Sequence, residues 1–134
     1  MKQEHEMKVD WLLDNTNLSC SEILIRMGMQ KIQMDSIEAR KISSAFGGGI
    51  AGLGEVCGIV LGGVLAIGLQ FGRENETQSN DKVRKVTREF CQAFQKEYGY
   101  LRCSDLTFRL ELNERYKKCR NMIKFATQRL LKLL

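Results

Sequence analysis

The sequence predicts an all-α fold, a compact single-domain bundle of five to six helices with a central glycine-rich helix. The 134-residue chain contains no proline and is rich in helix-forming Leu, Lys, Glu, Arg and Met. No alternating apolar pattern is long enough for a strand, whereas apolar residues recur at helical spacings along several segments. A chain of this length buries one core, so residues 1–134 are expected to form a single helical domain.

Three short helices are predicted before the glycines. Residues 1–15 form a lead-in segment, with a helix over 4–14. Ser19 is the predicted N-cap of a second helix, with Glu22 completing a capping box, and Asp35 starts a third helix that ends at glycines 47–49. The side chains expected to face inward in these helices are Met7, Trp11, Leu12, Ile23, Leu24, Met27, Ile37, Ile42, Ala45 and Phe46.

Four further helices follow. A glycine-rich helix is predicted over 53–70 and another over 81–98, stopped by Gly99, with a polar loop at 73–80 between them. Ser104 or Asp105 caps a short helix through Leu112, and a long final helix covers 113–133. The apolar stripe of the final helix consists of Tyr116, Cys119, Ile123, Ala126, Leu130 and Leu133.

The glycine-rich segment has three interpretations. Residues 47–52, GGGIAG, match a dinucleotide-binding pattern, but the residues before them predict a helix where that motif needs a strand. Residues 56–72 are uncharged and only just long enough to span a bilayer, and glycines interrupt them. Gly54, Gly58 and Gly62 recur every four residues, which favours a close-packed helix. We therefore expect no stable membrane insertion, and Gly58 and Gly62 as close-packing neighbours of Cys57.

The net charge of +5 is concentrated near the carboxyl end, where residues 102–134 carry nine basic and three acidic side chains. No interleaved aromatic residues accompany the charge, so we expect a solvated basic face and no nucleic-acid partner. The amino terminus has no secretory signal, which favours a cytoplasmic location. The basic residues expected on the solvated face are Arg115, Lys117, Lys118, Arg120, Lys124, Arg129 and Lys132.

Five cysteines are unusual in a reducing compartment and call for a redox, metal or packing role. They contain no C-x-x-C pair, and the single histidine, His5, makes a histidine-based metal site improbable. Cys20 and Cys103 fall at predicted helix starts, where backbone N–H groups lower a thiol pKa. Cys57 and Cys119 are expected on inward stripes, and Cys91, between aromatic neighbours, is expected to be a packing residue.

Four segments resemble a family of redox-active proteins named for its C_GCAxxG_C_C cysteine pattern. They are NLSCSE, FGGGIAGLGEVCGIVLGGVLAIGLQFG, FCQAFQKEYGYLRCSDL and CRNMIKFATQRLL, and the resemblance runs from about residue 14 to the end. One departure is Ile59, which stands where the family has alanine. The resemblance implies redox activity and a link to a transport process, but no substrate. It carries over, as candidate catalytic residues, Cys20, Cys57, Cys103 and Cys119, and leaves Cys91 as an extra.

Three hypotheses follow. The first is thiol–disulfide chemistry with an unknown redox partner and no cofactor, in which Cys20 or Cys103 attacks and the pairs are Cys103 with Cys119 and Cys20 with Cys57. The second is a binding module whose four thiolates hold zinc or an iron–sulfur cluster. The third is a structural interaction protein with packed cysteines. Small residues on the glycine helix would also suit a homodimer.

Overall fold

The computed structural model describes residues 3–134 and confirms the all-α class, with seven helices in that range rather than five or six. The same residues contain no β-strand, only an isolated bridge between Val56 and Arg102. Each of the seven falls on a segment for which the sequence predicts a helix, including the short helices at residues 36–43 and 103–106. The helices are α1 (Glu4–Asn15), α2 (Cys20–Gly28), α3 (Ser36–Ser43), α4 (Gly58–Phe71), α5 (Asp81–Tyr98), α6 (Cys103–Leu106) and α7 (Leu112–Leu133).

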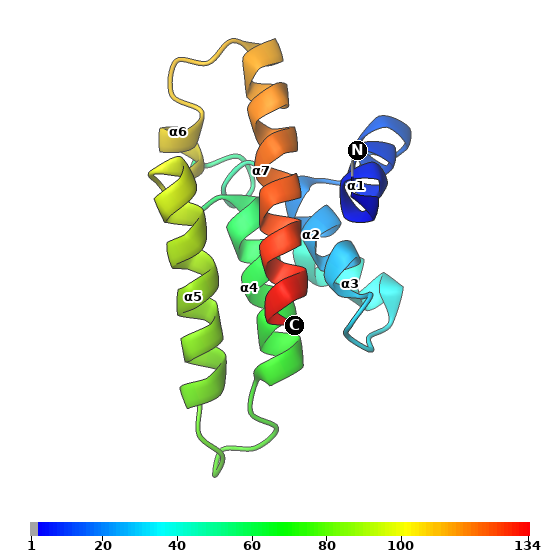
Figure 1. Ribbon diagram of the computed structural model, residues 1–134, viewed down its shortest axis with the longest axis vertical. Coiled ribbons are helices and arrows are strands. Elements are labelled where there is room, and N and C mark those ends of the chain that lie inside the picture. Colours follow the sequence, from blue (N-terminus) through cyan, green and yellow to red (C-terminus); the bar gives the residue numbers. More distant parts are fainter. Residues whose placement is uncertain (1–2) are drawn as a thin grey trace.

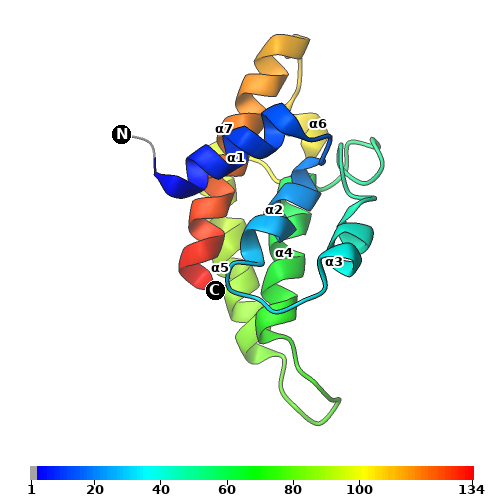
Figure 2. The same ribbon diagram turned by 90° about the vertical axis from the view of Figure 1, so that its right-hand side faces the viewer.

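Helices α4, α5 and α7 run along the long axis of the molecule (Figure 1). α2 packs against α4 and α7 and carries α3 on its outer side, while α1 crosses α7 (Figure 2). Residues 73–80 connect α4 to α5 at the end of the molecule opposite α6 (Figure 1). The glycine-rich helix α4 is therefore central, because it contacts α2, α5 and α7.

Two glycines of α4 allow its neighbours to approach closely. A Cβ built on Gly62 would lie 2.6 Å from the backbone oxygen of Ser21 in α2. A Cβ built on Gly63 would lie 2.3 Å from Cζ of Phe90 in α5, a side chain that is fully buried. Each glycine thus removes a side chain at a helix contact, so that α2 and α5 both reach the backbone of α4.

The predicted starts of α2 and α3 are confirmed. The Ser19 N–H donates to the Glu22 carboxylate at 3.3 Å, which is the reciprocal half of a capping box. The Asp35 carboxylate accepts from the backbone N–H groups of Ile37 and Glu38 at 2.8 and 3.1 Å. These polar caps satisfy donors that the first helical turn leaves without partners.

The start of the glycine helix is wrong in the prediction, because α4 begins at Gly58 and not near residue 53. Residues 48–52 adopt left-handed backbone angles, including φ of 63° at Ile50 and 51° at Ala51. Gly54, with φ of 75°, belongs to this loop and not to a helical stripe. The loop satisfies its own donors by turning back on itself, since the N–H groups of residues 50–55 bond to carbonyls within residues 45–50.

Several predicted inward positions are solvent-exposed. In α1 the buried residues are Val9 and Leu12, while Trp11 is 60% exposed because the opposite stripe of the helix faces the core. In α3 the small residues Ala39 and Ser43 face the core, which leaves its larger apolar side chains outside. The predicted inward residues that are exposed are Met7, Trp11, Ile37, Ile42, Ala45 and Tyr116.

Two basic residues of α7 hold α1 instead of joining a solvated face. Arg120 contacts Asp10 at 2.8 Å and Asp14 at 2.7 Å, and Lys124 contacts Asp10 at 2.8 Å. Charge pairs of this kind fix orientation more than they add stability. In residues 3–134, no helix is both long and apolar enough to cross a bilayer.

Candidate functional site

Four of the five cysteines come from separate segments to one end of the bundle, where α6 and the starts of α2 and α4 gather (Figures 1 and 2). These thiols lie near enough to affect one another's pKa: Cys119 and Cys103 contribute to raising the pKa of the Cys20 thiol, and Cys20 and Cys103 contribute to raising that of the Cys57 thiol. All five cysteines are free thiols. The four positions are the first residue of α2, the N-cap of α4, the first residue of α6 and the N-terminal half of α7, namely Cys20, Cys57, Cys103 and Cys119.

A short backbone pairing joins the cysteine segment of α4 to that of α6. The Cys57 N–H donates to the Leu101 carbonyl at 2.8 Å, and the Cys103 N–H donates to the Glu55 carbonyl at 2.7 Å. These bonds flank the bridge between Val56 and Arg102. Because the bonds involve backbone groups, they hold residues 55–57 beside residues 101–103 whatever the oxidation state of the thiols.

Glycines make room for two of the sulfur-bearing side chains. A Cβ on Gly58 would lie 2.7 Å from Cys20 Sγ, so this sulfur lies against the first turn of α4. A Cβ on Gly49, in the left-handed loop, would lie 2.8 Å from Cys103 Cβ. Gly58 and Gly49 therefore permit contacts that any other residue would obstruct.

A pocket of about 350 Å³ opens beside two of these cysteines. Cys20 and Cys119 both line it, and both are partly exposed, whereas Cys57 and Cys103 are buried behind them with 4% and 8% exposure. Its volume lies within the range of small-molecule sites. The remaining lining residues are Leu13, Leu18, Ser19, Leu112, Arg115, Tyr116 and Ile123.

Burial controls the acidity of Cys20 and Cys57. It raises the pKa of the Cys57 thiol to about 12, with a smaller contribution from the Cys20 thiol. Burial also raises the pKa of the Cys20 thiol, although hydrogen bonds from the Gly48 and Ser21 backbone oppose it. The expectation that a helix start would lower the pKa of Cys20 is therefore wrong, because desolvation outweighs the backbone donors.

Cys119 is surrounded by positive charge. Burial raises the pKa of its thiol, but Arg115 opposes that shift by its charge and by hydrogen bonding, and Lys118 adds a second opposing charge. Arg115 precedes Cys119 by four residues, so the two side chains share one face of α7. Cys119 is thus the one thiol of the pocket with basic side chains placed to stabilise its thiolate.

Cys91 lies apart from this chemistry. It is half-buried in α5, and burial alone raises the pKa of its thiol. It packs against the edge of the apolar core, beside the buried Phe90. This position agrees with the prediction of a packing residue.

The metal-binding hypothesis finds no preformed site in the part of the chain that the structure describes. Among residues 3–134, no group of three or more His, Cys, Asp or Glu side chains is placed to hold a metal ion. A structural zinc site requires four such ligands at bonding distance. The four thiols interact with one another but do not form such a coordination shell.

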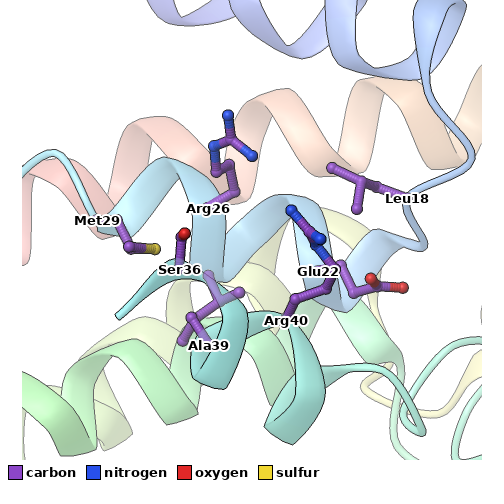
Figure 3. A pocket seen from close by; sticks show the side chains of 8 residues that line it. Leu18, Glu22, Arg26, Met29, Ser36, Ala39 and Arg40 are labelled. Atoms are coloured by element: carbon purple, nitrogen blue, oxygen red, sulfur yellow. The ribbon is translucent and has the colours of Figure 1, made fainter. Parts of the chain in front are cut away.

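A second hollow, between α2 and α3, is separate from the cysteines. Figure 3 shows it from close by, with Arg26 and Arg40 among its lining residues. Its free volume is about 10 Å³, which is space for no more than a water molecule. No cysteine lines it, so it does not extend the cysteine pocket.

Two features of the site did not emerge from the sequence. Arg115 was assigned to a solvated face, although its spacing of four from Cys119 on one helix could have indicated a contact. Gly48 and its left-handed neighbours hold a backbone N–H at Cys20, and no sequence signal separates such a loop from the start of a glycine-rich helix.

The comparisons with known proteins identify the family but no characterised relative. No curated protein and no solved structure matches the chain. One family model, described as "Putative redox-active protein (C_GCAxxG_C_C)", matches residues 18–133, which leaves residues 1–17, including α1, and the last residue outside the match. The match covers the four clustered cysteines and the helices that position them. The chain therefore belongs to the C_GCAxxG_C_C family of redox-active proteins.

Proposed function

We propose that this protein is a thiol–disulfide reductant in which Cys119 attacks a disulfide and Cys20 resolves the mixed disulfide. The observation that carries the proposal is that Cys20 and Cys119 line one pocket, and the contribution of Cys119 to the raised pKa of Cys20 agrees with their proximity. This pair differs from the pairings that we predicted from the sequence. Cys57 and Cys103 lie behind it and serve as a buried second pair, out of direct reach of substrate.

Cys119 is the better nucleophile of the two accessible thiols. Arg115 and Lys118 favour its thiolate, and a thiolate is the attacking species in disulfide exchange. Cys20 receives backbone hydrogen bonds but no cationic side chain lowers its pKa. These two environments favour Cys119 as the attacking thiol and Cys20, which lies against α4, as the resolving thiol.

The proposed reaction consists of two successive thiol–disulfide exchanges. The Cys119 thiolate attacks one sulfur of a substrate disulfide, the substrate S–S bond breaks, and the leaving thiolate takes the bonding electron pair. The Cys20 thiolate then attacks Cys119 Sγ and expels the second substrate thiolate. The two cysteines are oxidised to one disulfide, the substrate is reduced to two thiols, and an external dithiol must restore the protein.

The thiol pKa values argue against a strongly oxidising cysteine pair. Stabilised thiolates make a cysteine pair oxidising, because they stabilise its reduced form. Here burial destabilises the thiolates of both Cys20 and Cys119. Neither thiolate is therefore stabilised, so the reduced pair lacks the feature that makes a cysteine pair strongly oxidising, and we expect it to donate electrons to other disulfides.

The test is to trap the mixed disulfide. In Cys20→Ser the resolving thiol is absent, so a small aromatic disulfide should leave one substrate half attached to Cys119, detected by mass spectrometry of peptides. The protein with all its cysteines should instead release both halves and gain a Cys20–Cys119 linkage. Cys91→Ser is the matched control and should behave like the parent protein.

Two results would refute the proposal. One is a Cys20→Ser protein in which the adduct sits on Cys91 or is absent. The other is a Cys119→Ser protein that still releases both substrate halves at the parent rate. Far-ultraviolet circular dichroism of each variant checks that the helices are retained.

A further inference from the structure

The cysteine pocket has apolar walls. Leu13 comes from α1, Leu18 from the segment before α2, and Leu112 and Ile123 from α7. Together with the ring of Tyr116 they surround a space of about 350 Å³. Pockets of this size and character bury the apolar body of a small molecule. The substrate of this pocket must therefore carry a ring or a comparable apolar group.

Among residues 3–134, Arg115 is the only charged side chain that lines the pocket. In residues 3–134 no carboxylate forms a salt bridge with it. The nearby Lys118 is already engaged, since its ammonium group donates to the Leu106 carbonyl at 2.7 Å. A guanidinium has five N–H donors, so Arg115 can assist the Cys119 thiolate and still bind an anion.

The spacing of Arg115 and Cys119 restricts where such an anion sits. Residues four apart on a helix place their Cβ atoms about 5–6 Å from each other. The Arg115 guanidinium also hydrogen-bonds to the Cys119 thiol, so a substrate whose sulfur meets Cys119 must carry its negative group within about one helical turn of that sulfur. A planar carboxylate suits a guanidinium best, because the two form paired hydrogen bonds.

We infer that the cysteine pocket selects disulfides that combine an apolar ring with a carboxylate within about one helical turn of the reacting sulfur, held by Arg115. This inference rests on the proposed function and names the substrate class of the same site. Leu13 extends the site to α1, which lies outside the part of the chain that matches the family.

The experiment compares two aromatic disulfides. One is 5,5′-dithiobis(2-nitrobenzoate), whose carboxylate is meta to sulfur, and the other is the neutral 2,2′-dithiodipyridine. The ratio of their reaction rates at Cys119 is measured for the parent, for Arg115→Gln and for Lys117→Gln, a matched loss of charge at an exposed residue outside the pocket lining. Loss of the Cys119 thiolate in Arg115→Gln slows both reagents equally, so it does not change the ratio of their rates.

Arg115→Gln should lower the ratio of carboxylate to neutral reagent by about tenfold, the worth of one charge-assisted contact. Lys117→Gln should change the ratio by less than about twofold, since an exposed charge outside the pocket acts only through screened solvent. Equal ratios in the parent and in Arg115→Gln would overturn the inference. An equal fall in Lys117→Gln would also overturn it, by showing a general charge effect.

A binding measurement separates this inference from the proposed function. The double variant Cys20→Ser, Cys119→Ser cannot exchange disulfides, and 2-nitrobenzoate has no sulfur. Saturable binding of 2-nitrobenzoate to this variant, lost when Arg115→Gln is added, supports the anion site even if the parent protein reduces nothing. Disulfide exchange in the parent with no such binding would leave the proposed function standing and refute the carboxylate site.

Discussion

Cys57 illustrates how burial changes a single side chain. Its thiol is 4% exposed, and burial raises its pKa from the ordinary 9.0 to about 12. The backbone N–H groups of Ile59 and Val60, at the start of α4, oppose the rise but do not cancel it. Desolvation therefore outweighs a helix N-terminus here, in the same sense as at Cys20.

Stability should fall at alkaline pH because of this shift. Below about pH 9 the Cys57 thiol is protonated in both the folded and the unfolded state, so its titration takes nothing from the free energy of unfolding there. Between about pH 9 and pH 12 the unfolded chain loses this proton first, and the free energy of unfolding falls by up to about 1.4 kcal/mol per pH unit. Urea denaturation at about pH 7.5 and about pH 10.5 measures the loss.

Cys57→Ala is the comparison that isolates this thiol from the lysines and tyrosines that also titrate. The variant should lose less stability between the two pH values than the parent does. Cys91→Ala, which removes a more exposed thiol, should lose nearly as much as the parent. An identical loss in the parent and in Cys57→Ala would contradict the assignment.

At the residue scale the sequence predicted identities better than environments. The family pattern names all four clustered cysteines and leaves Cys91 outside the predicted site. The pKa directions of Cys20 and Cys57 were not predictable, because helix position favours the thiolate whereas burial, which only the fold reveals, opposes it more strongly. The prediction that Trp11 and Tyr116 face the core is wrong for a different reason. Large apolar residues are also common at protein surfaces, so their presence does not identify the buried face of a helix.

Among the elements, α4 depends most on its glycines. Gly62 lies against α2 and Gly63 against α5, while Gly68, one turn beyond, has no neighbour within 4 Å of the position where its Cβ would be. All three lie within the same helix and carry the same intrinsic cost relative to alanine. They therefore form a matched set in which only the neighbours differ.

Gly63→Ala should destabilise the protein by about 1–3 kcal/mol, because the new methyl meets the buried Phe90 ring and overpacks the core. Gly68→Ala should instead stabilise it by about 0.5–1 kcal/mol through helix propensity alone. Thermal and urea unfolding of the two variants measure both effects. Destabilisation by Gly68→Ala, or none by Gly63→Ala, would contradict the packing described for α4.

At the element scale the helices were predictable and the loop before α4 was not. Capping residues Ser19 and Asp35 marked helix starts directly, and Gly99 adopts the left-handed conformation expected of a helix stop. The sequence does not distinguish the left-handed turn at 48–52 from the segment leading into a helix, because glycine is compatible with left-handed and with helical backbone angles. Ile50 and Ala51 are held there by the surrounding hydrogen bonds and not by local preference.

The whole molecule is organised so that helices distant in sequence deliver cysteines to one end. α4 is the centre on which α2, α5 and α7 pack, and the pairing of residues 55–57 with 101–103 adds α6. That pairing involves only backbone groups and leaves no pattern in the side chains. The sequence therefore could not predict that Cys57 lies near Cys103. The clustering itself was predicted, but only through the family resemblance.

A Cys20–Cys119 disulfide would join α2 directly to α7 across the pocket. The loop that it closes spans most of the chain, and cross-links over long loops stabilise a fold by about 4–5 kcal/mol in the chain-entropy model. The oxidised protein should accordingly be the more stable form. This gain favours the disulfide and hence a reducing couple.

A redox titration with disulfide mapping tests the central claim most directly. The protein is equilibrated with reduced and oxidised dithiothreitol at defined ratios, free thiols are blocked, and the linkages are identified by mass spectrometry. The account predicts a reversible Cys20–Cys119 disulfide with a midpoint at or below about −270 mV, the value for thioredoxin. Cys20 and Cys119 thiols that stay reduced at every ratio, or that link only to Cys91, would contradict it.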